Sequence, residues 1–204
     1  MSFHQQYKTP FERESGREYL LYLSSYYPHK NVEIINQVVP ILEAHYPGKF
    51  VFVLTLPAKE FDNVIDNSIL QSVINMGPVR PEECPGLYQA CDYTFIPTLL
   101  ECFSASYAES MAMDRPILTS DMGFAKTVCK DAAIYFDPID PKDIAEKINQ
   151  LSLNQSQCEE LVELGRERLQ SFPSAKERAV KYIEVCAMLT SDLKLKLSIL
   201  RNEN

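Results

Sequence analysis

Short apolar runs alternate along this chain with longer segments whose apolar residues recur every three or four positions. The clearest run is residues 50–56, Phe-Val-Phe-Val-Leu-Thr-Leu, which is nearly continuous in its apolar character. Such a run is typical of a strand that is buried on both faces of a sheet. By the same criterion, strands are expected at residues 19–23, 50–56, 73–76, 92–96, 116–119 and 133–136.

Segments with the periodicity of a helix lie between and after these runs. In residues 31–45, for example, Val32, Ile35 and Val38 would share one face of a helix. Residues 62–72 form a polar stretch in which no element is predicted. Helices are expected at residues 31–45, 82–91, 105–113, 124–130, 141–151, 155–171 and 174–200, the last of them bent or broken.

Buried strands that alternate with amphipathic helices predict an α/β fold with a doubly wound parallel sheet of the Rossmann type and extra C-terminal helices. In such sheets, ligands bind at the carboxyl ends of the strands, where the loops meet helix N-termini. Ligand contacts are therefore expected in loops 24–31, 77–82 and 97–106. Residues 1–18 precede the alternation and are expected to form an arm or interdomain linker.

The composition of the chain excludes several classes of ligand and of protein. The chain has 204 residues and a formal net charge of −8, which argues against a nucleic acid as partner, since nucleic acids demand a basic face. The three histidines are scattered and the six cysteines lack the close pairing of a zinc site, so no metal is expected. No apolar stretch is long enough for a membrane span, and the N-terminus has no signal-peptide core. A cytoplasmic protein is therefore expected, or a soluble domain that works on the cytosolic side of a membrane.

Two acids frame the loop that follows the fourth predicted strand. Glu101 and Glu109 would lie about 12 Å apart along a helix axis, which is wider than the roughly 5–9.5 Å of a glycoside hydrolase pair. They suit opposite ends of one elongated ligand, and the N–H groups near residues 102–104 would point at an anion. Taken alone, the segment favours a simpler interpretation, in which Ser106 and Glu109 form a capping box and Glu101 is a solvated loop acid.

Other motifs occur in a fixed order around this pair. They are Pro28-His-Lys30-Asn31, Gly77-Pro-Val-Arg80, Leu87-Tyr-Gln-Ala-Cys-Asp92, Arg115-Pro-Ile-Leu-Thr-Ser and Asp131-Ala-Ala-Ile-Tyr-Phe-Asp137-Pro. Together with Glu101-x7-Glu109, they resemble the group one family of retaining glycosyltransferases with a GT-B fold. The resemblance runs from about residue 20 to residue 151.

The resemblance implies the C-terminal, donor-binding half of a hexosyltransferase that uses a nucleoside diphosphate sugar. Residues 19–172 would bind this donor. Residues 173–204 would form a helical segment that packs on a missing N-terminal, acceptor-binding domain, so the fragment alone is expected to be inactive. Any peripheral membrane association is expected through the missing half only.

Catalytic roles are implied for two residues. Lys30 would neutralise the donor diphosphate, and Glu101 would meet the transferred sugar. The donor's own phosphate would take the acceptor proton as it leaves, so the protein would supply positioning and electrostatic relief. No bound metal or cofactor is implied, because basic side chains and helix dipoles relieve the charge.

The remaining donor-binding residues would grip the nucleotide. Glu109 would accept hydrogen bonds from the ribose hydroxyls. The N–H groups of Phe103 and Ser104 would meet the sugar and its phosphate, and Arg80 would lie near the base or the diphosphate. Asn31 and Ser25 complete the predicted set.

Some positions depart from the family pattern. Ser25 stands where the family has an arginine, Ser104 where it has a glycine, and Thr127 where it has a glutamate. These departures keep a second hypothesis open, a degenerate, non-catalytic subunit that binds a partner chain. A Rossmann-type dehydrogenase lacks support, because residues 24–27, Ser-Ser-Tyr-Tyr, replace the glycine-rich turn after the first strand.

Overall fold

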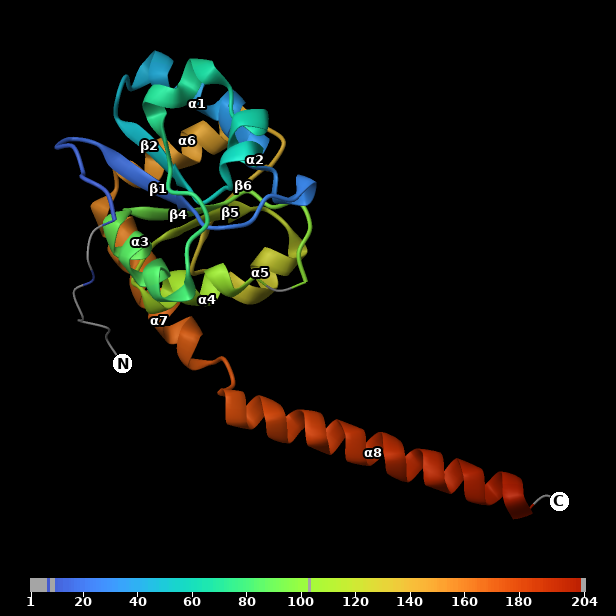
Figure 1. The fold of residues 1–204 in the computed structure, drawn as a ribbon. Helices are drawn as coiled ribbons and strands as arrows, with labels where there is room; N and C mark the ends of the chain where they lie inside the picture. Colours follow the sequence, from blue (N-terminus) through green and yellow to red (C-terminus); the bar gives the residue numbers. More distant parts are fainter. Residues whose placement is uncertain (1–6, 8–9, 103, 203–204) are drawn as a thin grey trace. The chain divides into compact units, whose positions relative to one another are not determined.

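The computed structural model describes residue 7 and residues 10–102 and 104–202. The chain divides into two compact units, residues 1–169 and residues 170–204. The first unit holds the sheet and the helices that cover it, and the second holds one long helix (Figure 1).

The first unit is built on parallel strands in the order β3-β2-β1-β4-β5-β6. The strands are β1 (Glu18–Tyr22), β2 (Phe50–Leu54), β3 (Val73–Asn75), β4 (Tyr93–Ile96), β5 (Ile117–Ser120) and β6 (Ile134–Phe136). Because β1 pairs with both β2 and β4, the strand order reverses beside β1. The predicted doubly wound parallel sheet is confirmed, and its switch point lies between β1 and β4.

Helices cover both faces of this sheet. Figure 1 shows α1, α2 and α6 on one face and α3, α4, α5 and α7 on the other. Their bounds are α1 (Ile35–His45), α2 (Ala58–Val64), α3 (Cys84–Ala90), α4 (Ala105–Ala112), α5 (Gly123–Cys129), α6 (Pro141–Ser152) and α7 (Gln155–Gln170).

Two apolar layers form because successive strand residues point to opposite faces. In β1, Leu20 packs in the layer that also holds Phe52 and Phe95, whereas Tyr19 and Leu21 pack in the other layer. All three β1 side chains are at most 1% exposed. Burial on both faces explains why the strands read as continuous apolar runs.

Two stretches of the first unit differ from the sequence prediction. Residues 62–72 contain the end of α2 and a 3-10 helix, Asn67–Ser72, because Ile65 and Ile69 bury their side chains in the core. The helix predicted from residue 31 begins only at Ile35. It is preceded by the 3-10 turns Pro28–Lys30 and Val32–Ile34, which Asn31 separates with a φ of 56°.

The second unit consists mainly of α8 (Ala175–Asn202). The prediction that this helix is bent or broken is wrong: it is one continuous helix, and its sequence contains neither proline nor glycine to interrupt it. Ser174 and Glu177 start it with a reciprocal capping box, in which each side chain accepts the other's backbone N–H. No helix in the described part of the chain is long and apolar enough to cross a membrane.

Candidate functional site

The site lies at the carboxyl edge of the sheet, where the loops after β1 and β4 meet. Lys30 ends the 3-10 turn after β1, and Glu101 lies in the loop after β4. The Lys30 Nζ donates to Glu101 Oε2 in an ion pair whose two side chains are only 18% and 16% exposed. The fold therefore brings together the two predicted catalytic residues, which are 71 positions apart in the chain.

Asn31 ties three loops of this edge together. Its Nδ2 donates to the carbonyl oxygen of Pro97 at 3.1 Å and to that of Pro138 at 2.9 Å. Its backbone is left-handed, a conformation that asparagine tolerates better than most residues. The backbone N–H of Leu99 adds a bond of 2.7 Å to the carbonyl oxygen of His29. Asn31 thus fastens the loop that carries Lys30 to the loops after β4 and β6. A direct contact between Asn31 and a ligand stays a prediction.

Glu109 lies on α4 at the edge of a cleft of about 310 Å³. Ser25, Thr55 and Cys84 also line this cleft. The Glu109 side chain is exposed, and its Oε2 accepts a hydrogen bond of 2.9 Å from the hydroxyl of Tyr88. Burial, with the charge of Glu109 as the second cause, raises the pKa of Tyr88 far above its ordinary value. Tyr88 therefore stays protonated and donates.

Tyr88 was missed by sequence reasoning. It lies in the segment Leu87-Tyr-Gln-Ala-Cys-Asp92, which carried part of the family resemblance, and its helical spacing indicates only a core residue. Nothing in the local pattern shows that its hydroxyl meets an acid on the next helix along the chain.

The helix α4 begins shortly after Glu101, in the loop that follows β4. Ser104 is the N-cap residue, is 9% exposed, and makes no side-chain capping bond. The first N–H groups of such a helix lack partners within the helix and favour an anion. Phe103, the other predicted backbone donor, lies outside the described residues.

The capping-box interpretation of this segment is wrong. Ser106 lies inside α4 rather than at its N-cap, and its Oγ donates to the carbonyl oxygen of Leu23 at 3.4 Å. The Glu109 carboxylate meets Tyr88 instead of the start of the helix. Glu109 therefore does not cap α4.

Positive charge is scarce in the described lining of this cleft. Among the described residues that line the cleft, none is a lysine or arginine, and Ser25 is one of the lining residues. The Arg80 side chain is 77% exposed and pairs with Glu83 at 3.3 Å. Lys30, the other predicted cation, pairs with Glu101, which neutralises its charge. The structure thus brings Ser25 to the cleft but does not bring the charge of Arg80 there.

A larger cleft, of about 600 Å³, lies at the opposite, amino-terminal edge of the sheet. Its acids are engaged: Asp92 pairs with Arg13 at 2.6 Å, and Asp114 pairs with Arg166 at 2.8 Å. Ligands of doubly wound sheets bind at the carboxyl edge, so the smaller cleft beside Glu109 is the candidate site. Among the described residues, no group of three or more histidines, cysteines or acids is placed to hold a metal ion.

The parallel sheet with its switch point defines a doubly wound α/β protein of the Rossmann-like class. The sequence model of the family "Glycosyl transferases group 1" matches residues 4–168. The chain belongs to this family, which confirms the resemblance seen in the sequence.

Known proteins agree with this assignment. The chain is 21% identical over 165 residues to an uncharacterized glycosyltransferase of Methanocaldococcus jannaschii, a match that covers 78% of this chain and 45% of that protein. The chain thus spans less than half of the length of this relative. The fold is similar to that of a sucrose-phosphate synthase from Thermosynechococcus elongatus, with a TM-score of 0.71 at 17% identity, covering 88% of this chain and 47% of that one.

A second solved structure shows the same likeness. An α,α-trehalose-phosphate synthase (UDP-forming) from Burkholderia vietnamiensis superposes with a TM-score of 0.72 at 12% identity, over 84% of this chain and 46% of that chain. At such identities these likenesses establish the fold, and the family match establishes membership in the glycosyltransferase family.

Proposed function

We propose that this chain is the donor-binding domain of a retaining, GT-B glycosyltransferase that transfers a hexosyl group from a nucleoside diphosphate sugar. The observation that supports this most is the meeting of Lys30 with Glu101 beside the N-terminus of α4, with Glu109 further along the same helix. One extended ligand fits this order: sugar at Glu101, diphosphate at Lys30 and the helix N-terminus, and ribose at Glu109.

In this proposal the protein positions the donor and relieves charge. The bond between the sugar C1 and the phosphate oxygen breaks, a bond from C1 to the acceptor oxygen forms on the same face, and the acceptor proton passes to the leaving phosphate. Lys30 exchanges Glu101 for the diphosphate, and Glu101 is released toward the sugar. The step needs no protein nucleophile, because positioning and electrostatic stabilisation lower the barrier.

The rest of the proposal concerns partners. Residues 19–172 bind the donor, and residues 173–204 pack on a separate acceptor-binding domain, which would also mediate any contact with a membrane. Among the described residues of 170–204, no other element covers the large apolar side chains of α8, such as Tyr182, Ile183 and Met188. We propose a cytoplasmic enzyme with neither a resident metal nor a cofactor.

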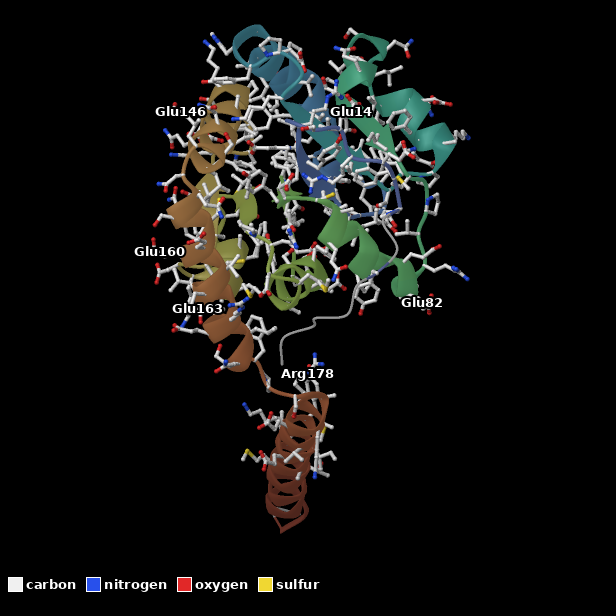
Figure 2. The ribbon with its side chains drawn as sticks, turned by 90° about the vertical axis from the view of Figure 1, so that its left-hand side faces the viewer. Glu14, Glu82, Glu146, Glu160, Glu163 and Arg178 are labelled. Atoms are coloured by element: carbon white, nitrogen blue, oxygen red, sulfur yellow. The ribbon has the colours of Figure 1, made fainter. Side chains whose placement is uncertain are left out.

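Calorimetry tests the donor site directly. The chain is titrated with uridine, guanosine and adenosine diphosphate sugars, and one of them is expected to bind with a micromolar-range dissociation constant. Glu109→Ala should weaken this binding at least about tenfold, because hydrogen bonds from the ribose hydroxyls to a charged acceptor are lost. Glu160→Ala is the matched control, since Glu160 is an exposed acid that projects from α7 (Figure 2). The proposal fails if none of the three donor classes binds.

A second candidate, a degenerate subunit that binds a partner chain, is favoured by one observation: the described cleft lining holds no lysine or arginine. It predicts that the complete protein associates with its partner but transfers no sugar. Sugar transfer by the complete protein to any acceptor excludes it.

A further inference from the structure

Tyr88 joins the core of the first unit to the candidate site. It lies on α3, is 1% exposed, and packs with Leu21, Val53 and Leu87. Its hydroxyl donates to Glu109 Oε2 at 2.9 Å, although the Glu109 side chain is itself exposed at the cleft. A rigid, buried group thus holds one oxygen of an otherwise mobile carboxylate.

We propose that Tyr88 is a positioning residue for the nucleoside: it holds Glu109 in the orientation that accepts hydrogen bonds from the vicinal hydroxyls of a ribose. The inference rests on the proposed function and adds the residue that makes Glu109 selective for a ribonucleotide over a deoxyribonucleotide. Tyr88 does not touch the ligand. It acts through Glu109.

The chemistry of the pair supports this role. Tyr88 occupies Oε2 and leaves Oε1 without a hydrogen-bond partner among the described residues. A carboxylate accepts several hydrogen bonds, so both oxygens retain capacity for hydroxyl donors. An exposed glutamate that rotates freely must be immobilised when a ligand binds, and this costs conformational entropy. Tyr88 immobilises Glu109 before the ligand arrives.

The structure offers a matched control for the loss of a tyrosine hydroxyl. Tyr93 is also buried, and its hydroxyl donates to Glu18 Oε2 at 2.7 Å. This second pair lines the cleft at the amino-terminal edge of the sheet, away from Glu109. Tyr88→Phe and Tyr93→Phe therefore remove the same type of bond, but only the first faces the candidate site.

The test compares ribose recognition in the variants by calorimetry. The probes are the ribonucleoside diphosphate that binds the wild-type chain and its 2′,3′-dideoxy counterpart. The wild-type chain should prefer the ribonucleotide by about tenfold or more, because two hydroxyls donate to a charged acceptor. Tyr88→Phe should reduce this preference to about threefold or less, as expected when the acceptor is no longer held in place. Tyr93→Phe should keep it.

A double variant shows whether Tyr88 acts through Glu109. If it does, Tyr88→Phe has no further effect on ribose preference in the background of Glu109→Ala. A purely structural tyrosine would lower the melting temperature in both backgrounds and leave the preference unchanged.

Each outcome has a distinct meaning. A preference that persists in Tyr88→Phe at the wild-type value overturns the role of Tyr88 and leaves the proposed function standing. A wild-type chain that binds no nucleoside diphosphate overturns the proposed function together with this inference, whereas one that binds both probes equally overturns this inference alone. The wild-type titration separates these cases before any substitution is made.

Discussion

Lys30 and Glu101 form an ion pair across two loops at the carboxyl edge of the sheet, and both side chains are mostly withdrawn from water. Each of these residues therefore satisfies the other. A phosphate that binds Lys30 would have to displace the Glu101 carboxylate, which already pairs with this lysine. The contact between the two loops would therefore depend on whether an anionic ligand is bound.

Removing one member of this pair should destabilise the chain. Lys30→Met leaves Glu101 unpaired and mostly buried, so the free energy of unfolding should fall by about 1–3 kcal/mol. The double variant Lys30→Met/Glu101→Met should recover most of this loss, because no unpaired charge remains. Urea denaturation measures all the variants. If the double variant loses as much stability as Lys30→Met and Glu101→Met lose together, the pair contributes no coupling energy.

Asn31 should be sensitive to substitution for two separable reasons. Asn31→Ala loses the hydrogen bonds to Pro97 and Pro138 and leaves at a φ of 56° a residue that tolerates this backbone less well than asparagine, so it should cost about 2–4 kcal/mol. Asn31→Gly loses the same bonds without backbone strain and should cost less. Equilibrium unfolding of the two variants separates the contributions. If the glycine variant is as unstable as the alanine variant, strain contributes nothing.

Ser25→Arg should strengthen the binding of nucleoside diphosphates. The new guanidinium would face a cleft whose described lining holds no cation, so the affinity should rise about three- to tenfold. The gain should shrink at high salt, because the site is open to solvent. Calorimetry at two salt concentrations measures it, with Ser156→Arg on the exposed surface of α7 as control. An equal gain in the control would point to net charge rather than to the site.

The cysteines should differ in reactivity toward a thiol reagent. Cys102 and Cys186 are exposed and should react first in the native chain. Burial raises the pKa of Cys129 to about 12, so at pH 8 this thiol is almost wholly protonated and should react slowly. Labelling followed by peptide mass analysis measures each site, and unfolded chain provides the reference in which all react. Fast labelling of Cys129 in the native chain would contradict its burial.

Several structural features could be predicted because their signals are local. The continuous apolar run at β2 indicated a strand buried on both faces, and the packing of Phe52 in one layer and Val53 in the other confirms this. The position of the loops followed from the topology of parallel sheets. By contrast, α2 lies in a segment without clear periodicity, and its neighbour Ile65 gains its burial only from the folded core.

The sequence by itself determined the class of fold and the residue types at the candidate site. Apolar spacing sets which segments can be buried, and Lys30, Glu101 and Glu109 occupy motif positions that need no coordinates to find. Only the tertiary structure decided their partners. Lys30 pairs with Glu101, and Glu109 with Tyr88, because loops and helices that are distant in the chain meet at one edge of the sheet. Such contacts depend on packing between elements, which local spacing does not encode.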